Sequence, residues 1–410
     1  MRLHFDLSKV NCMKKLLILG GSNYIVPVIQ KAHAMGVYVI TCDYLPENAG
    51  HRYADEYHNV SIVEKDDVLH LARKLQVDGI SSFATDPGVV TAAYVAEHLG
   101  LPTPPYASVD ILQHKDKFRH FLQKHGFHVP FSKGYESKDE ALQDAEMLEY
   151  PVIVKPTDSA GSKGVTRVNR AEELPEAVNM AFQRSLGGRI IIEKFLEKVG
   201  CSSDTDCFSV DDALVFASFD NQYFDDGAAN PYTPAAYSWP SGMPSEVQKE
   251  LRSELDRLMH LLHMGTSIYN VETRLATDGK PYIMEVSPRG GGNCLSEMLE
   301  RACGIDLITA HIRAALGMTV PFMQDPVYHG AWAEVILHGG QDGVFRRVQI
   351  APELQPYVAE QNIWVHPGDV VHRFTGANAA IGTLVLKFPS AELSDAYMKK
   401  LRDVITVIIE

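Results

Sequence analysis

Two glutamates on neighbouring runs of apolar, aromatic and β-branched residues are the first candidates for chemistry. Glu272 lies in YNVETRLA and Glu285 in YIMEVS, and the TDGK sequence between them is typical of a tight turn. We therefore expect a hairpin within residues 269–293 that places the two carboxylates side by side. Adjacent carboxylates repel each other, and Mg²⁺ would relieve this because it binds carboxylate, water and phosphate oxygens. The plainer alternative is two solvated glutamates on a surface hairpin.

A lysine followed by a loop of small polar residues is the second candidate. The strand-like run YPVIVKP ends near Lys155, and the sequence TDSAGSKGV follows it. Backbone N–H groups of such loops bind phosphate oxygens, and a lysine adds a positive charge. The GxxxxGK[ST] pattern of a P-loop is absent, and a flexible hairpin tip is the alternative interpretation. The run RIIIEKFLE at 189–197 then predicts a strand that continues into a hinge.

The first hundred residues predict an open α/β domain. Short, continuously apolar runs alternate with segments of helical periodicity, a pattern typical of a parallel sheet covered on both faces. We expect strands at 15–20, 37–42 and 79–83, and helices near 24–35, 66–75 and 87–99.

The turn after the first expected strand raises the question of a dinucleotide site. Gly20, Gly21 and Ser22 form this turn, and Asp43 ends the second strand, but GGSNYI lacks the third glycine of GxGxxG. Ligands of open α/β sheets bind at the carboxyl ends of the strands. These residues and the Thr85-Asp86 turn are therefore either one wall of a pocket or ordinary turns and helix caps.

Composition limits the classes of partner. The chain has 410 residues and a formal net charge of -14. This length predicts two or three domains. The negative charge and the lack of a basic run argue against a nucleic-acid partner, whereas a small anion such as ATP needs only a few local cations.

The cysteines and the hydropathy pattern indicate a cytoplasmic protein. The six cysteines form no CxxC pair, which argues against a disulfide framework and a zinc site and favours a reducing setting. Apolar runs fall short of the roughly 18 residues of a membrane span, so we expect no membrane partner. The run LLILGG is too short for a signal peptide.

Taken in order, several motifs resemble those of the ATP-grasp superfamily of carboxylate-amine ligases. They are Asp116-Lys117 before a helix that ends in HGFHVP, YPVIVKP with Lys155, the DSAGSKG loop, IIEKFL with Glu193, and VET followed by MEVSPR. The resemblance covers about residues 15–320 and extends to the ATP-grasp core of carbamoyl-phosphate synthase and biotin carboxylase. The tail is similar to the C-terminal domain of amino-acid ligases, in which a PGD turn precedes a strand with an Ile-Gly pair.

The resemblance implies a mixed α/β and α+β architecture. It would combine an ATP-grasp fold with an N-terminal open parallel α/β domain and a small C-terminal α+β domain. A Pro-rich LPTPPY segment and a change of composition past residue 320 favour the same division. The implied parts are an extension at 1–12, the N-terminal domain at 13–113, the ATP-grasp domain at 114–322 with a lid at about 150–197, and the C-terminal domain at 323–410.

The resemblance also implies nucleotide contacts. Lys117 and Lys155 would contact the phosphates of ATP, and the glycine-rich loop would close over them. Glu193, Lys194 and Leu196 would meet the adenine at the hinge, mostly through backbone groups. The implied loop contacts are Ser159, Gly161, Ser162 and Gly164.

The metal and the reacting carboxylate follow from the same resemblance. Glu272 and Glu285 would hold Mg²⁺, or Mn²⁺ in its place, and also serve the nucleotide. Ser287 stands where the family usually has asparagine as a third ligand, so either Ser287 binds weakly or the metal is held by glutamates and water alone. Arg289 would face the reacting carboxylate. Asp204 and Asp206 lie after the hinge, where relatives often carry an acidic residue.

The implied reaction joins a carboxylate to an amine. Attack of a carboxylate on the γ-phosphate of ATP is anion meeting anion, so metal, lysine and arginine must neutralise charge while water is excluded. An amine would then attack the acyl phosphate, with Arg289 and the N–H groups of residues 290–292 stabilising the oxyanion. No covalent nucleophile is needed, so Cys294 is interpreted as a core residue at a helix start.

The triple glycine after Arg289 and the tail favour an amino-acid substrate. The runner-up is a purine-pathway type of enzyme that activates formate or bicarbonate, in which a histidine is expected soon after the arginine. A non-catalytic nucleotide-binding relative is a third interpretation. The expected partners are small-molecule carboxylate and amine substrates, and a homodimer is compatible because dimers are common in the family.

Overall fold

The computed structural model describes residues 13–158 and 164–410, which form two compact units. Unit 1 consists of the described residues within Met1–Tyr106 and Ile308–Pro321, and unit 2 of those within Ala107–Leu307 and Phe322–Glu410. Among the described residues, no helix is long and apolar enough to cross a membrane.

Unit 1 is built on a parallel sheet with the strand order β3-β2-β1-β4. Leu17 in the central strand pairs with Ile40 on one side and Ile80 on the other, and the apolar strand residues are buried. The strands are β1 (Lys15–Leu19), β2 (Tyr38–Cys42), β3 (Glu56–His58) and β4 (Gly79–Ser82). The predicted open α/β sheet is therefore confirmed.

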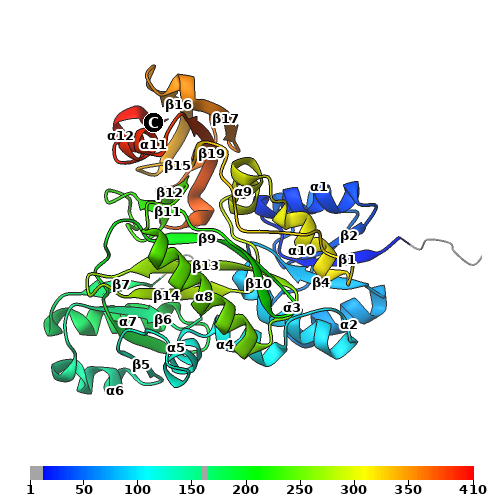
Figure 1. Cartoon of the computed structure of the whole chain (residues 1–410), viewed down its shortest axis with the longest axis horizontal. Coiled ribbons are helices and arrows are strands. Elements are labelled where there is room, and N and C mark those ends of the chain that lie inside the picture. The colour runs from blue at the N-terminus through cyan, green and yellow to red at the C-terminus, as the bar shows by residue number, and fades with distance from the viewer. Residues whose placement is uncertain (1–12, 159–163) are drawn as a thin grey trace, which may run out of the picture. The chain divides into compact units, whose positions relative to one another are not determined.

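Helices cover both faces of this sheet, with α1 on one face and α2 and α3 on the other (Figure 1). Pro87 in the first turn and Gly100 at the end, with φ of +66°, give α3 its start and stop signals. The helices are α1 (Val26–Ala34), α2 (Lys65–Leu75) and α3 (Asp86–Leu99), with 3₁₀ turns η1 (Asn23–Ile25) and η2 (Ala49–Tyr53).

The second segment of unit 1 contains most of α10 (Leu307–Ala315) and packs beside β4. Ser81 Oγ lies 2.6 Å from His311 Nε2. A Cβ at Gly79 would lie 2.4 Å from the carbonyl oxygen of Ala315, so the close approach requires glycine. The chain thus returns to its first domain after residue 307.

In unit 2, the first sheet is antiparallel with the order β5-β8-β6-β7. Its apolar face packs on α6 and α7. The predicted strands around Lys155 and Glu193 are confirmed as β6 and β8. The elements are α4 (Tyr106–Gln113), α5 (Lys115–Lys124), β5 (Ser132–Tyr135), α6 (Lys138–Gln143), η3 (Ala145–Met147), β6 (Val152–Pro156), β7 (Thr166–Val168), η4 (Ala171–Glu173), α7 (Leu174–Arg184) and β8 (Ile190–Lys194).

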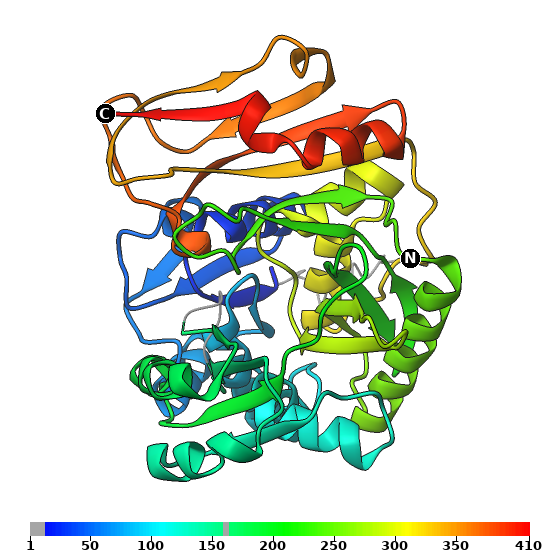
Figure 2. The ribbon, with the colours of Figure 1, turned by 90° about the vertical axis from the view of Figure 1, so that its left-hand side faces the viewer.

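The C-terminal sheets combine strands from before and after residue 322. One sheet has the order β11-β12-β15-β19-β17 and another the order β18-β16-β20. Helix α11, drawn in red in Figure 2, packs on β12, β15 and β19. The elements are β11 (Asn221–Phe224), β12 (Pro234–Trp239), β15 (Ala331–His338), β16 (Gly343–Ile350), η5 (Gln355–Tyr357), β17 (Val358–Ile363), β18 (Val370–Val371), η6 (Ala377–Ala379), β19 (Ala380–Phe388), α11 (Ala391–Met398), α12 (Leu401–Val404) and β20 (Ile405–Ile409).

The remaining sheet of unit 2 contains the predicted hairpin and has the order β10-β9-β13-β14. Strands β13 and β14 pair antiparallel across the expected turn, and β9 pairs with the other edge of β13. Helix α8 packs on this sheet through its leucines. The elements are β9 (Ser203–Val210), β10 (Ala213–Ala217), α8 (Ser245–Leu262), β13 (Ser267–Leu275), β14 (Pro281–Ser287) and α9 (Leu295–Cys303).

Candidate functional site

Three carboxylates form one row across the hairpin sheet. Glu272 on β13 pairs directly with Glu285 on β14 and with Asp204 on β9. Directly opposed residues of antiparallel strands point to the same face of the sheet. The pairing therefore gathers Glu272 and Glu285 as the sequence predicted, and it adds Asp204 to them.

A second row lies two residues along the same strands. Asn270 pairs with Ser287 on β14 and with Asp206 on β9, and the period of two places this row on the same face. Asn270 Nδ2 donates to Asp204 Oδ1 at 2.9 Å. Gln113 Nε2 donates to Ser287 Oγ at 3.3 Å. An amide and a hydroxyl thus lie beside the carboxylate row.

Each glutamate of the first row lies beside a basic side chain. Lys115 Nζ is 3.5 Å from Glu285 Oε2, and Arg274 Nη2 is 3.4 Å from Glu272 Oε1. The glutamate side chains are 39% and 30% exposed, respectively, so solvent and ligands reach them. The face of the sheet that carries the glutamates therefore has two positively charged side chains beside it.

The donor set suits Mg²⁺ bound jointly with phosphate. Among the described residues, no group of three or more histidine, cysteine, aspartate or glutamate side chains is arranged to hold a metal ion. Mg²⁺ commonly binds one or two carboxylates and takes its other ligands from water and substrate phosphates. Glu272 and Glu285 match that requirement.

The two aspartates of β9, Asp204 and Asp206, have raised pKa values. Burial, and then the charge of Glu272, raise the pKa of Asp204 to about 7, and Arg289 opposes the rise. Burial likewise raises the pKa of Asp206 to about 6, against hydrogen bonds from Ser296 and the Gly291 N–H and the charge of Arg289. A cation bound at this face would relieve both carboxylates.

The C-terminal sheet also contacts the carboxylate row. Gln222 Nε2 on β11 and Tyr237 OH on β12 donate to Asp204 Oδ2 at 3.1 and 3.2 Å. Asn293 Nδ2 in turn donates to Tyr237 OH at 3.2 Å. Sequence reasoning missed these contacts because they join segments that carry no shared motif.

Arg289 follows the hairpin directly, and the structure places it near the acidic rows. Its side chain is 8% exposed, and its Nη1 donates to the Gly290 carbonyl at 3.1 Å. The N–H of Gly291, expected to stabilise an oxyanion, instead donates to Asp206 Oδ1 at 2.8 Å. In this structure the glycine stretch therefore fixes Asp206 with one of its N–H groups.

Cys294 lies just before α9 with a positive φ of 57°. Burial and the neighbouring carboxyl of Glu334 raise the pKa of its thiol well above the ordinary value. A thiol of this kind is a poor nucleophile at neutral pH. The predicted position of Cys294 at a helix start is confirmed, but the residue is half-buried rather than part of the core.

Lys155 lies in a buried ion cluster with two other residues. Its Nζ is 2.5 Å from Glu193 Oε2, and Arg119 Nε is 2.6 Å from Glu193 Oε1. Burial raises the pKa of Glu193, but Arg119 and Lys155 outweigh it and hold the pKa at about 2. Glu193 is therefore an anion at neutral pH.

The two lysines at the start of α5 have different partners. Lys117 Nζ is 2.5 Å from Asp110 Oδ2 and is 41% exposed, while Lys115 faces Glu285. The structure thus brings Lys115, rather than Lys117, to the carboxylate row. The spacing Lys115 to Arg119, four residues on one helix, is the signal that could have revealed the two missed cations.

The predicted lid and hinge residues are only partly described. Ser159, Gly161 and Ser162 lie outside the described residues. Gly164 has a φ of +75°, and a Cβ there would lie 3.0 Å from Arg184 Cβ. Glycine is therefore the residue that this turn accepts.

At the hinge, Lys194 and Leu196 have separate contacts. Lys194 Nζ is exposed and lies 2.9 Å from Glu149 Oε2. The Leu196 carbonyl accepts a hydrogen bond from Arg274 Nη1 at 3.1 Å. Arg274 therefore joins the hinge backbone to Glu272.

In unit 1, the Asp43 carboxylate makes hydrogen bonds within its own loop. Asp43 accepts hydrogen bonds from Leu45 N and Asn48 Nδ2 at 3.1 and 2.9 Å and is 5% exposed. A Cβ at Gly20 would lie 2.9 Å from Thr85 Oγ1. These contacts agree with the plainer interpretation of this region as tight turns.

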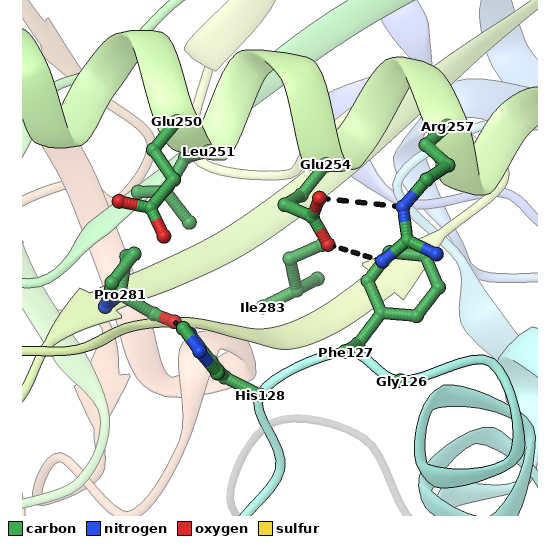
Figure 3. Close-up of a pocket in the computed structure, with 9 residues that line it drawn as sticks. All are labelled: Gly126, Phe127, His128, Glu250, Leu251, Glu254, Arg257, Pro281 and Ile283. Carbon is green, nitrogen blue, oxygen red and sulfur yellow. Dashed lines mark hydrogen bonds and ion pairs between the residues drawn. The ribbon is translucent and has the colours of Figure 1, made fainter.

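A separate cavity of about 180 Å³ lies between α8, the start of β14 and the segment after α5 (Figure 3). Figure 3 shows Arg257 paired with Glu254 beside the ring of Phe127. The residues that line this cavity include none of those that the sequence predicted for the site.

Comparisons with known proteins identify the fold. The model of the D-ala D-ala ligase C-terminus family matches residues 122–306. The carbamoyl phosphate synthase large chain of Halomonas eurihalina is 26% identical over 275 residues, which are 65% of this chain and 25% of that protein.

Two solved structures resemble nearly the whole chain. L-amino acid ligase from Bacillus licheniformis has a TM-score of 0.78 at 21% identity, over 97% of this chain and 99% of that chain. The biotin carboxylase domain of Hydrogenobacter thermophilus 2-oxoglutarate carboxylase, crystallised with MgADP, ADP and bicarbonate, has a TM-score of 0.75 at 17% identity, over 97% and 91%.

This chain spans about a quarter of the length of the carbamoyl phosphate synthase chains that it matches. The resemblance to the ATP-grasp superfamily is confirmed, and the chain has the ATP-grasp fold with the expected mixture of α/β and α+β parts.

Proposed function

We propose that this ATP-grasp chain is an ATP-dependent ligase that joins a carboxylate to an amine through an acyl phosphate, with an amino acid as one substrate. The observation that carries the proposal is the directly paired Glu272 and Glu285, each beside a basic side chain. This arrangement answers the main difficulty of the reaction, which is to bring a carboxylate to a polyanion.

Glu272 and Glu285 would hold Mg²⁺, or Mn²⁺, with Ser287 as a weak further ligand. The ion would offset charge on the β- and γ-phosphates of ATP. Lys155 and Lys117 are proposed to contact the phosphates, together with Ser159, Gly161, Ser162 and Gly164. The hinge residues Glu193, Lys194 and Leu196 are proposed for the adenine. The structure adds Lys115, whose Nζ lies 3.5 Å from Glu285 Oε2, to this set of cations.

In the first step, a carboxylate oxygen of the substrate attacks the γ-phosphorus and ADP leaves. Arg289 would orient this carboxylate, since its buried guanidinium lies at the end of the hairpin. In the second step, the amine nitrogen attacks the acyl carbon, the C–O bond to phosphate breaks, and the amide forms with loss of a proton. Water would have to be excluded during this step, because it hydrolyses an acyl phosphate.

The substrates are proposed by chemical class, and one of them is an amino acid. The GGG sequence after Arg289 supports an amino acid, and the fold of L-amino acid ligase is similar over nearly the whole chain. The domain boundaries, a homodimer and a cytoplasmic setting stay predictions.

A phosphate-release assay with Mg²⁺, ATP and pools of amino acids tests the proposal. We expect phosphate only when a particular carboxylate and amine are present together, with ADP formed in equal amount. Mass spectrometry of the mixture would then give the amide. Silence across all pools, with ATP still bound, would favour a non-catalytic nucleotide-binding relative.

A second candidate activates formate or bicarbonate in place of an amino acid. It is kept because the similar biotin carboxylase domain was crystallised with bicarbonate. Separate arms of the same assay contain formate or bicarbonate with amine pools. Phosphate release that depends on either anion and not on amino acids would select this candidate.

The metal role of the hairpin predicts the behaviour of one charge-neutral variant. Glu285→Gln should abolish turnover and weaken the Mg²⁺ dependence, because an amide oxygen replaces an anionic ligand. The matched control is Glu250→Gln on the exposed face of α8, which should behave as wild type. Full activity of the Glu285 variant would contradict the metal assignment.

A further inference from the structure

We infer that Arg119 is the permanent counter-ion of Glu193 and thereby leaves Lys155 available to bind the phosphates of a nucleotide. This role would make Arg119 a positioning residue, since it acts through Glu193 and Lys155. The inference rests on the proposed function, because it concerns the same ATP site.

The geometry gives Glu193 two basic partners, one at each carboxylate oxygen. Arg119 Nε lies 2.6 Å from Oε1, and Lys155 Nζ lies 2.5 Å from Oε2. The side chains of Arg119 and Glu193 are 2% and 1% exposed, whereas Lys155 is 13% exposed. Lys155 is therefore the cation nearer to solvent and to an incoming ligand.

The buried carboxylate of Glu193 cannot be solvated by water if the Lys155 ammonium moves away from it. It lies on β8, between Ser132 of β5 and Ile153 of β6, so its backbone is fixed from both sides. A buried carboxylate without a positive partner is strongly destabilising. Were Lys155 its sole counter-ion, binding of a phosphate to Lys155 would leave Glu193 uncompensated.

Arg119 removes that conflict. Three ionised side chains, two positive and one negative, leave one positive charge in the cluster. An incoming phosphate oxygen can therefore neutralise Lys155 while Arg119 still neutralises Glu193. Arginine suits the permanent role, since its guanidinium keeps its charge when buried and holds a fixed geometry.

The Arg119 guanidinium has N–H groups beyond the Nε–H group that pairs with Glu193. Arg119 Nη1 is buried, and it has no hydrogen-bond partner among the residues that the structure describes. If Lys155 moves towards a phosphate, the Nε of Arg119 stays at the other carboxylate oxygen of Glu193. Arg119 lies on α5, four residues after Lys115, so the same helix supplies a cation to Glu285 and a cation to Glu193.

The test is a double-mutant cycle on nucleotide binding. Binding of MgATP to Arg119→Gln, Glu193→Gln and the double variant is measured by calorimetry, with thermal melting as a check of folding. Arg119→Gln alone should bind MgATP at least about tenfold more weakly, because Lys155 must stay with Glu193. In the Glu193→Gln background the same change should alter affinity by less than about threefold.

Two results would overturn the inference. One is a folded Arg119→Gln protein that binds MgATP like wild type. The other is an equal loss of affinity in both backgrounds, which would mean that Arg119 acts on the nucleotide directly or only supports the fold. The Glu193→Gln background keeps the test usable if Arg119→Gln alone fails to fold, since no buried anion is then left.

Wild-type protein separates this inference from the proposed function. If wild type neither binds MgATP nor releases phosphate with any substrate pool, the proposed function fails. If wild type binds MgATP and the cycle shows no coupling between Arg119 and Glu193, only the role of Arg119 fails.

Discussion

Ser287 is the residue at which this site departs from the expected pattern. Its hydroxyl lies 2% exposed beside the carboxylate row and accepts a hydrogen bond from Gln113. A hydroxyl engaged in this way is a weak ligand compared with the two carboxylates. The metal would therefore be held chiefly by Glu272, Glu285, water and phosphate.

Replacement of Ser287 tests whether the glutamates, rather than this hydroxyl, hold the metal. Ser287→Ala should change the Mg²⁺ concentration for half-maximal activity by no more than about threefold, while Glu272→Gln should raise it by more than about tenfold. Activity measured against Mg²⁺ concentration at saturating ATP gives both values. A large effect of Ser287→Ala would make the hydroxyl a ligand in its own right.

Residue roles differ in how far the sequence could reveal them. The pairing of the hairpin glutamates was predictable because a local turn sets it, and the strands of Lys155 and Glu193 were predictable because each is a short apolar run. The roles of Lys155 and Glu193 are implied by the family resemblance. Arg119 was missed because its partner Glu193 is 74 residues away. Asp204 joined the row through the β9–β13 register, a non-local pairing that no local pattern determines.

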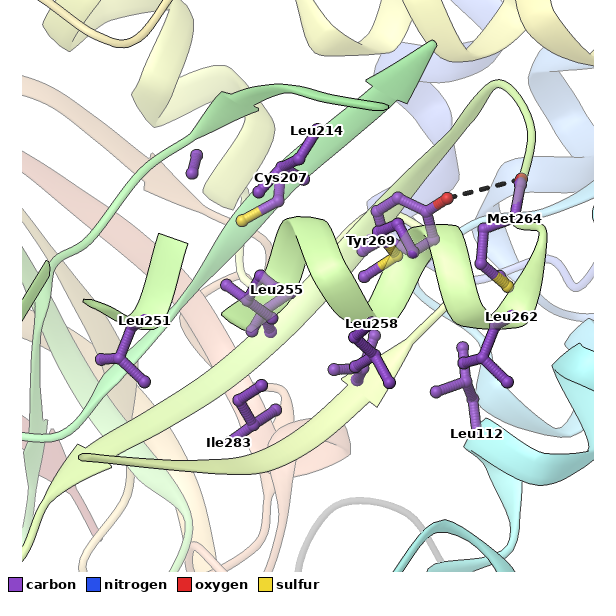
Figure 4. Close-up of a cluster of buried hydrophobic side chains, with 14 of the residues drawn as sticks. Leu112, Cys207, Leu214, Leu251, Leu255, Leu258, Leu262, Met264, Tyr269 and Ile283 are labelled. Atoms are coloured by element: carbon purple, nitrogen blue, oxygen red, sulfur yellow. Dashed lines mark hydrogen bonds between the residues drawn. The ribbon is translucent and has the colours of Figure 1, made fainter. Parts of the chain in front are cut away.

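At the scale of elements, α8 supports the sheet that carries the carboxylate rows. Figure 4 shows Leu251, Leu255, Leu258 and Leu262 of this helix pointing to the same buried cluster as Ile283 of β14. The leucines recur every three or four residues, so one face of the helix is buried. The precision of the Glu272 and Glu285 row therefore depends on this packing.

Truncation of one leucine should loosen the sheet. Leu255 is fully buried, and Leu255→Ala should lower the free energy of unfolding by about 2 to 5 kcal/mol through lost contacts and a cavity. Leu261 on the same helix is 37% exposed, so Leu261→Ala is the matched control and should cost below about 1 kcal/mol. Urea denaturation measures both, and equal effects would contradict the assigned packing.

At the scale of the molecule, the chain returns to unit 1 after residue 307, a course that periodicity along the sequence does not encode. His311 in the returning segment contacts Ser81 of β4, which is 230 residues away. Burial lowers the pKa of His311 from 6.5 to about 4, so the folded protein holds this imidazole neutral. Burial of His311 therefore makes the stability of unit 1 sensitive to pH.

The sign of that dependence follows from proton binding. Between pH 6.5 and 4 the unfolded chain binds a proton at His311 and the folded chain does not, so the stability of unit 1 is full above pH 6.5 and falls as the pH drops towards 4. The loss amounts to about 3 kcal/mol. Hydrogen exchange of β4 amides should show it, and His311→Gln should remove the pH dependence. A wild-type profile that does not change over this range would contradict it.

Polar strands such as β3 and β5 carry no apolar signal, whereas strands that are apolar runs, such as β1 and β8, were predictable. The sheet that joins β11 and β12 to β15 was not, since its strands lie on both sides of the hairpin and α9 in sequence. The shared sheet brings Tyr237 and Gln222 to Asp204. Part of the site environment thus depends on how distant segments assemble.

The acyl phosphate is the central claim, and transfer of an oxygen isotope tests it most directly. The carboxylate substrate found in the pool assay is labelled with ¹⁸O at both oxygens and turned over with MgATP and the amine. The account predicts that each phosphate released carries one ¹⁸O, because the attacking carboxylate oxygen leaves with phosphorus. Unlabelled phosphate, or AMP and pyrophosphate in place of ADP, would contradict it.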